Sequence, residues 1–181
     1  MSKKTPSHID LDKFWPYHVI VLANQISRHT HRVAKAEAGL NLSQWRVLAA
    51  VADKPGRTAA QVAMMTPMDK TIVSRAVNSL IKLGVIKKSA TPDDKRRFSL
   101  SVTTKGNEIY VKISKQLIKT IDPSLFKSGE QQNFIAELKN FSTKLDQVLL
   151  KKAKMQRQSL CAPKVSPNYV STETDKLTGP S

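Results

Sequence analysis

The chain has 181 residues, the length of one domain or of a small domain with appendages. Its 30 Lys and Arg residues outnumber 14 acidic residues, and the formal net charge of +16 indicates a polyanionic partner, either nucleic acid or an anionic membrane surface. The single cysteine, Cys161, excludes a disulfide framework within one chain and a cysteine-rich zinc site. Because no apolar run is long enough for a membrane span or a signal peptide, we expect a cytoplasmic protein with no membrane partner.

Enzymatic chemistry has little support in this sequence. The glycines stand alone, so neither a phosphate-binding loop nor a dinucleotide-binding fingerprint is present. The G-x-S-x-G and H-E-x-x-H motifs are also absent, and all the histidines lie within the first 31 residues. We therefore expect a protein that is not an enzyme and that uses no cofactor and no metal.

The first elements in chain order are a polar arm and two helices. Residues 1–10 form a flexible arm, and a helix over 11–38 begins close to Pro16 and ends at Gly39. Its apolar residues recur at helical spacing: Trp15, Val19, Leu22, Ile26 and Val33. Ser43 is the expected N-cap of a second, shorter helix, which ends at the turn Lys54-Pro55-Gly56.

Two further helices follow in quick succession. Thr58 and Gln61 form a capping box before a short helix that ends ahead of Pro67. The next helix runs from Met68 to Leu83, and Gly84 occupies the position typical of a helix C-terminus. Its apolar face is expected to contain Ile72, Val73, Ala76, Val77, Leu80 and Leu83, and its opposite face is polar and basic.

A β-hairpin is predicted after this helix. Val85–Lys88 reads as one short strand and Phe98–Val102 alternates at period two as the other, with a long basic tip over 89–97. Between residues 66 and 105 there are nine basic and three acidic residues, so excess positive charge is concentrated here. Three helices followed by such a hairpin predict a winged helix-turn-helix in a mainly α protein.

The remaining elements are two helices and a tail. Thr103 caps the first, Asp122-Pro123 interrupts the chain, and a second capping box is expected at residues 128–131. The last helix carries a two-heptad apolar seam: Phe134, Leu138, Phe141, Leu145 and Val148. A single small domain has no obvious use for such a seam. Beyond Lys154 periodicity is lost, so residues 155–181 are expected to be a disordered basic and polar tail.

The polar face of the helix from Met68 to Leu83 has the residue types that contact DNA. Short donors and a bidentate guanidinium suit the major groove and its phosphates, which indicates DNA contacts from Lys70, Thr71, Ser74, Arg75 and Asn78. Arg96 and Arg97 lie on the narrow hairpin and suit the electronegative minor groove.

Five stretches taken together resemble the MarR family of bacterial winged helix-turn-helix transcription regulators: residues 40–48, 68–75, 80–85, 94–96 and 102–106. The resemblance covers roughly residues 11–150 and implies a single domain over 11–154. Within this domain, a winged-helix lobe over 42–103 lies between two dimerisation regions, the helices over 11–38 and 104–154. The resemblance implies an obligate homodimer in which the first and last helices interlock, with the seam from Phe134 to Val148 buried against the partner chain. We expect such a dimer to recognise a pseudo-palindromic operator. The resemblance also implies that Asp94 orients Arg96 at the minor groove.

The resemblance further implies a repressor released by a small ligand, an aromatic carboxylate or its coenzyme A thioester. The expected pocket lies between the first helix, the second helix and the recognition lobe. Residues suited to an aromatic anion there are Trp15, His18, Arg28, Trp45 and Arg46. The alternative for Trp15 and Trp45 is ordinary core packing, and for His18 a structural interface contact.

Two other functions remain open at this level. One is an architectural DNA-binding protein without an effector, and the other is a protein-interaction module that acts through its long terminal helices. The basic segment near the end of the last helix, with Lys151, Lys152, Lys154 and Arg157, either complements the helix dipole or adds phosphate contacts.

Overall fold

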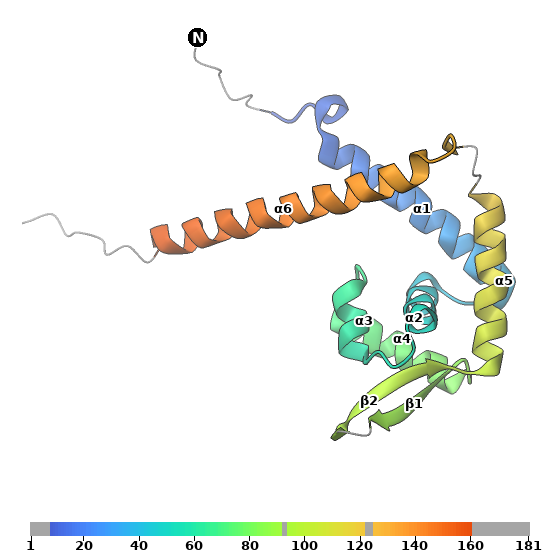
Figure 1. The fold of residues 1–181 in the computed structure, drawn as a ribbon. Helices are drawn as coiled ribbons and strands as arrows, with labels where there is room; N and C mark the ends of the chain where they lie inside the picture. Colours follow the sequence, from blue (N-terminus) through green and yellow to red (C-terminus); the bar gives the residue numbers. More distant parts are fainter. Residues whose placement is uncertain (1–7, 92–93, 122–124, 161–181) are drawn as a thin grey trace, which may run out of the picture. The chain divides into compact units, whose positions relative to one another are not determined.

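The computed structural model describes residues 8–91, 94–121 and 125–160, without the side chains of 91–97 and 157–160. The chain divides into two compact units, Met1–Asp122 and Pro123–Ser181, which are described separately (Figure 1). Among the described residues, the first unit contains a short 3-10 turn, five helices and a hairpin, and the second contains one long helix. No helix in the described ranges has the length and apolar character needed to cross a membrane.

The first helix has the limits that the sequence predicted. A 3-10 turn, Leu11–Lys13, precedes α1, Trp15–Ala38, and Pro16 lies in the first turn of the helix, where its missing N–H costs nothing. Gly39 ends the helix with φ of 67° and donates its N–H to the carbonyls of Ala34 and Lys35. This left-handed conformation favours glycine, which lacks a Cβ.

The next two helices begin with capping boxes. Helix α2, Leu42–Asp53, is capped by Asn41 and not by Ser43 as predicted. Asn41 accepts the Gln44 N–H at 2.9 Å, and Gln44 accepts the Asn41 N–H at 2.8 Å. Ser43 loses this competition because the residue three positions later is Arg46, which cannot accept a hydrogen bond in return. Helix α3, Ala59–Met65, has the expected box between Thr58 and Gln61.

Helix α4, Lys70–Lys82, leads into an antiparallel hairpin of β1, Ile86–Thr91, and β2, Asp94–Val102. The strands are longer than predicted because Ser89 and Ala90 continue the pairing, opposite Ser99 and Phe98. The loop before α3 joins the same sheet edge: Gly56 donates to the Leu100 carbonyl, and Leu100 donates to that of Arg57, both at 2.9 Å. The expected fold class, mainly helical with a β-hairpin wing, is confirmed.

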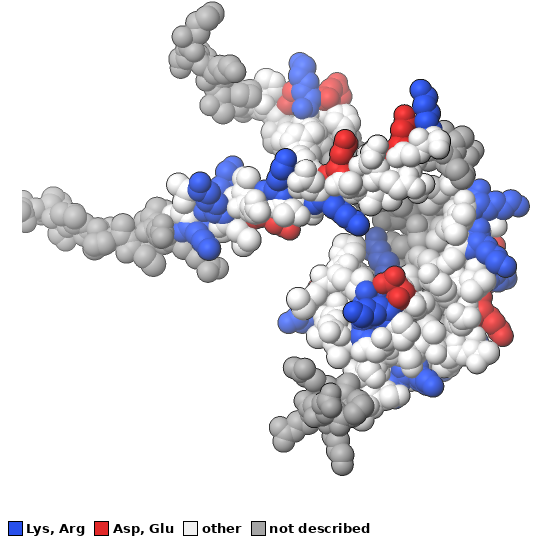
Figure 2. Space-filling model, in the orientation of Figure 1, with Lys and Arg blue, Asp and Glu red and all other residues white. Residues whose placement is uncertain are grey.

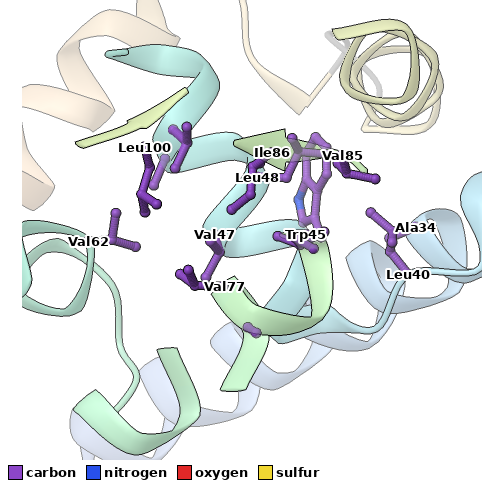
Figure 3. Close-up of a cluster of buried hydrophobic side chains, with 14 of the residues drawn as sticks. Ala34, Leu40, Trp45, Val47, Leu48, Val62, Val77, Val85, Ile86 and Leu100 are labelled. Atoms are coloured by element: carbon purple, nitrogen blue, oxygen red, sulfur yellow. The ribbon is translucent and has the colours of Figure 1, made fainter. Parts of the chain in front are cut away.

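The core of the first unit is apolar throughout. Side chains from α1 to α4 and from the hairpin meet in one cluster, including Leu40, Trp45, Leu48, Ile86 and Leu100 (Figure 3). Within the described ranges no polar or charged residue is buried, and the charged side chains lie on the surface (Figure 2). Burying each large apolar side chain stabilises the fold by about 1.5–3 kcal/mol, so this cluster holds the helix-turn-helix rigid.

Helix α5, Thr104–Thr120, packs against α1 within the first unit. Thr103 caps it as predicted, accepting the Gly106 N–H at 3.0 Å. Polar contacts join the two helices at two residue pairs. Lys112 lies 3.2 Å from the Glu37 carboxylate and donates to the Glu37 carbonyl at 3.0 Å, and the His29 Nε2 lies 2.8 Å from the Thr120 hydroxyl.

The second unit contains α6, Glu130–Leu160, which extends six residues beyond the predicted end at Lys154. The prediction of disorder from residue 155 was therefore wrong for 155–160. Residues 155–158 are Met, Gln, Arg and Gln, all good helix formers, so the helix continues after the apolar periodicity stops. At its start the Glu130 carboxylate accepts the Lys127 N–H at 2.8 Å. The predicted tail over 161–181 and residues 1–7 of the predicted arm lie outside the described residues.

Candidate DNA-binding surface

Helix α4 has one buried and one exposed face. Val73, Ala76, Val77 and Leu80 are at most 5% exposed and pack on α2, α3 and β1. The side chains singled out for DNA contact are all exposed: Lys70, Thr71, Ser74, Arg75 and Asn78. Ile72, which was expected on the buried face, is 39% exposed because it lies at the edge of that face, where the core ends. The helix thus presents polar and cationic groups on a rigid apolar back.

The start and middle of α4 are held by hydrogen bonds. Asp69 caps the helix by accepting the Ile72 N–H at 2.8 Å, which also places a carboxylate at the positive end of the helix dipole. Further along, the Gln44 side-chain amide of α2 donates to the Ser79 hydroxyl at 2.8 Å. Since Gln44 also closes the α2 capping box, the two helices are joined by a residue with little freedom.

The end of α4 is held by the start of α5. Lys105 donates from Nζ to the Leu83 carbonyl at 2.9 Å, which places a cation at the negative end of the recognition helix. The Thr103 hydroxyl donates to the Gly84 carbonyl at 2.7 Å. At Gly106 an added Cβ would lie 1.9 Å from the Val85 carbonyl oxygen, so only glycine allows this approach. We call these contacts, made by residues 103–106 with residues 83–85, the α4–α5 junction.

The hairpin contributes a cation that sequence reasoning missed. Lys88 lies opposite Leu100 on the face of the hairpin that turns toward the helices, and its Nζ is 3.8 Å from the Phe98 ring centroid. A hollow of about 500 Å³ opens there between α3, α4 and the hairpin. Ser74 and Asn78 line it together with Lys88 and Phe98. Alternation along β1, counted from the buried Ile86, is the sequence signal that places Lys88 on this face.

The predicted minor-groove residues lie in the outer part of the hairpin. The backbone of Asp94, Arg96 and Arg97 belongs to strand β2, as a wing requires. The side chains of these residues lie outside the described part of the structure, so the predicted pairing of Asp94 with Arg96 remains a prediction.

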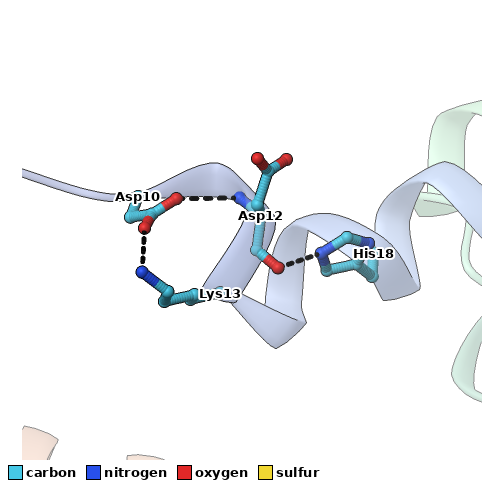
Figure 4. Close-up of polar contacts among 4 residues, drawn as sticks. All are labelled: Asp10, Asp12, Lys13 and His18. Carbon is cyan, nitrogen blue, oxygen red and sulfur yellow. Dashed lines mark hydrogen bonds and ion pairs between the residues drawn. The ribbon is translucent and has the colours of Figure 1, made fainter.

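The five residues predicted to bind an effector do not come together. Trp15 and His18 lie near the start of α1, where Trp15 is 48% exposed and His18 donates from Nε2 to the Asp12 carbonyl at 3.0 Å (Figure 4). Arg28 is 13 residues beyond Trp15, a separation of about 20 Å along a helix with a 1.5 Å rise per residue. It lines a hollow of about 390 Å³ with Gln25, His31 and Arg32.

The two candidates on α2 have structural roles. Trp45 is 8% exposed and stacks on Tyr110 of α5, with ring centroids 5.8 Å apart and an interplanar angle of 18°. Trp45 therefore packs as a core residue, which is the alternative that the sequence left open. Arg46 donates from Nη2 to the Ser27 hydroxyl of α1 at 3.0 Å. Among the described residues, no group of three or more His, Cys, Asp or Glu side chains is placed to hold a metal ion.

Comparison with known proteins shows what this part of the chain is similar to. The family model described as "MarR family" matches residues 38–97, which span α2, α3, α4 and most of the hairpin. The winged-helix lobe is therefore similar to the MarR family of transcriptional regulators. The matched segment contains all the residues that were predicted to contact DNA.

Similar sequences and structures extend over more of the chain. A protein of Thauera aromatica assigned to regulation of the hcr operon is 24% identical over 92 residues, which span 51% of this chain and 55% of that protein. An uncharacterised helix-turn-helix transcriptional regulator of Staphylococcus aureus is also 24% identical, over 61% of this chain and 75% of its own length.

Two solved structures show the same fold. A MarR/EmrR family regulator from Acinetobacter sp. ADP1 has a TM-score of 0.63 at 23% identity, over 77% of this chain and 99% of that chain. The repressor CouR, solved with a 23-mer DNA duplex, has a TM-score of 0.60 at 20% identity, also over 77% of this chain and 99% of its own.

Proposed function

We propose that this protein is a sequence-specific regulator of transcription that binds double-stranded DNA through α4. The observation that supports this most directly is the division of α4 into a buried apolar face and an exposed face of polar and cationic side chains. A helix held rigidly from behind can enter the major groove and keep its donors in register with the base edges.

The side chains of α4 then divide by chemistry. Arg75 has the planar fork that pairs with guanine O6 and N7, and Asn78 suits adenine. Lys70, Thr71 and Ser74 contact phosphates or base edges near the start of the helix, while Arg96 and Arg97 extend from the wing into the minor groove. Lys88 adds a positive charge in the hollow between helix and wing.

The protein acts as a homodimer on a pseudo-palindromic operator. Two-fold symmetry in the protein requires two half-sites, about 10–10.5 base pairs apart from centre to centre. The exposed apolar residues along α1 and α6, such as Leu22 at 49% and Leu138 at 51%, supply surface that a second subunit can bury. Repression is relieved by a small aromatic acid or its coenzyme A thioester, with Arg28 in its cationic hollow as the best-placed anion contact.

The major-groove role is tested with the Arg75→Ala variant. Fluorescence anisotropy with DNA from upstream of the gene should show binding weakened about tenfold or more, with sequence discrimination relaxed at one position of each half-site. The matched control is Lys115→Ala, which removes an exposed cation from α5 and should leave specific binding within about twofold. Equal effects of the two variants would contradict the assignment of α4.

The effector is tested in the same assay by adding aromatic acids and their coenzyme A thioesters at fixed salt. Release of operator DNA by one compound, and weaker release from an Arg28→Ala variant, supports a ligand-responsive repressor. Binding that no compound relieves supports an effector-independent DNA-binding protein. Protection of DNA without sequence preference supports an architectural one.

A further inference from the structure

Helix α6 ends in a stretch that is rich in lysine and lacks acidic residues. Lys151, Lys152 and Lys154 are all exposed, and the sequence contains no Asp or Glu between Asp146 and Glu173. Figure 2 shows blue side chains gathered toward this end of the helix. We call these three residues the terminal lysine cluster. Their charges lie within about one helical turn.

The helix dipole does not account for this cluster. Cations stabilise a helix C-terminus when they lie within its last turn, where the carbonyls lack partners inside the helix. The helix ends at Leu160, so Lys151 and Lys152 lie nine and eight residues before that end. A rise of 1.5 Å per residue places them about 12–14 Å away from it. The dipole would explain the cluster only if the helix ended at Lys154, as the sequence predicted.

Within the described part of α6, no ion pair neutralises the cluster. An acidic side chain must stand three or four residues away to pair with a lysine on the same helix. Those positions around the three lysines are occupied by Gln, Val, Leu, Met, Lys or Arg. No salt bridge of the described residues involves the cluster. Because Lys151 and Lys154 stand three residues apart, their like charges repel, and an anionic partner would relieve this repulsion.

The cluster has no apolar face of its own. The apolar seam of α6 recurs at spacings of four and three up to Val148, and the next position in that series is Lys152. Met155, one position further in the series, is separated from the seam by this exposed charge. A helix that lies on a membrane needs a continuous apolar face opposite its cationic one. The charge pattern therefore favours a polyanion in water over an anionic lipid surface.

We infer that the terminal lysine cluster binds the phosphates of double-stranded DNA without regard to sequence. A lysine ammonium is a compact charge on a flexible stem, which suits phosphate oxygens and reads no base. The three side chains stand along about 4.5 Å of helix, and they match the dense charge of a duplex, one per about 1.7 Å of its axis. Since Lys152 ends the apolar seam, the cluster lies beyond the part of α6 that a second subunit can bury.

This inference rests on the proposed function, to which it adds a second and non-specific DNA contact. Phosphate contacts of this kind hold a protein on DNA and let it slide along the duplex toward its operator. They raise the affinity for operator and for random DNA by about the same factor, so sequence discrimination is left to α4.

Salt titrations of the intact chain test the inference by fluorescence anisotropy. A cluster variant with Lys151→Gln, Lys152→Gln and Lys154→Gln should bind a random-sequence duplex about tenfold or more weakly near 0.1 M salt. The slope of the logarithm of the binding constant against the logarithm of the salt concentration should fall by about three, one for each lost phosphate contact. Glutamine is a good helix former, so the helix is retained. Arginine at the same three positions keeps the charges and should restore both quantities.

The matched control removes three other exposed lysines, with Lys115→Gln, Lys119→Gln and Lys139→Gln. This control variant has the same net charge as the cluster variant, and its slope should change by less than about one. Equal effects of the two triple variants would show that overall charge alone acts, and they would overturn the inference. An unchanged slope in the cluster variant would overturn it as well.

A lipid surface is tested by co-sedimentation with vesicles of phosphatidylcholine and phosphatidylserine in equal parts. We expect no vesicle binding that depends on the cluster. Vesicle binding that the cluster variant loses, together with an unchanged DNA slope, would overturn the inference in favour of a lipid surface.

The random-sequence duplex tests the cluster without any operator. A wild-type chain that recognises no operator refutes the proposed function and leaves the salt titration on random DNA unaffected. A cluster variant that keeps both the wild-type slope and an intact operator footprint refutes the inference alone.

Discussion

At the scale of single residues, the backbone of the winged-helix lobe depends on a few positions that accept only one type of residue. Gly106 is one of them, because the Val85 carbonyl oxygen occupies the space where any other residue would place its Cβ. That carbonyl also accepts the Thr103 N–H at 3.1 Å, so it is not free to move away. The close approach keeps the first turn of α5 against the segment that joins α4 to the wing.

The variant Gly106→Ala should therefore destabilise the fold although alanine is a better helix former than glycine. The steric conflict requires the chain to shift, and overpacking of this kind costs about 1–3 kcal/mol. Urea unfolding followed by circular dichroism measures the change in the free energy of unfolding. Asn107→Ala, at the next and exposed position, is the control and should change it by no more than about 0.5 kcal/mol. Similar values for the two variants would show that the junction adapts easily.

At the scale of elements, the recognition helix is positioned by its neighbours at two points. Gln44 of α2 contacts Ser79 in the last turns of α4. Lys105 of α5 contacts the carbonyl of Leu83, just beyond the end of α4. Neither Gln44 nor Lys105 belongs to the set predicted to contact DNA. Since α5 packs along α1, the α4–α5 junction connects the orientation of α4 to the helices expected at the dimer interface.

The variant Lys105→Gln should weaken operator binding about fivefold while leaving its salt dependence unchanged. The reason is that the Lys105 contact orients α4 but neutralises no phosphate. Loss of a phosphate contact would instead reduce the slope of the logarithm of the DNA-binding constant against the logarithm of the salt concentration by about one. Anisotropy titrations at several salt concentrations measure both quantities. Lys105→Arg keeps a cationic donor and should bind almost as the wild type does. A slope reduced by one would instead identify Lys105 as a phosphate contact.

The elements were largely predictable from the sequence because their signals are local. The apolar spacing of α4, the capping boxes at Thr58 and Thr103 and the turn at Gly39 all depend on residues within one or two turns. The errors arose where two local signals compete, as at Asn41 against Ser43, or where a helix continues by propensity alone beyond Lys154.

The candidate sites were less predictable because they depend on contacts between distant segments. No spacing rule shows that Trp45 is covered by Tyr110, 65 positions later, or that Arg46 is satisfied by Ser27. For the same reason the effector set named from residue type did not form one site. The DNA-facing set was easier to predict, since one helix face determines most of it.

At the scale of the whole molecule, the net charge of +16 fits a polyanionic partner, and the proposed contact surface for that partner lies in the lobe that is similar to the MarR family. Recognition of a pseudo-palindromic operator requires two copies of this surface, related by two-fold symmetry and held at a fixed separation by the helical regions. A single lobe reads only a few base pairs, so specificity for one operator depends on both lobes binding together.

Hydroxyl-radical footprinting of the purified protein on DNA from upstream of its gene tests this central claim most directly. A dimer that reads two half-sites should give two protected patches on one face of the duplex, about 10–10.5 base pairs apart from centre to centre, with related sequences in inverted orientation. A single patch, or uniform protection that does not depend on sequence, would contradict a dimeric winged-helix regulator that reads two half-sites.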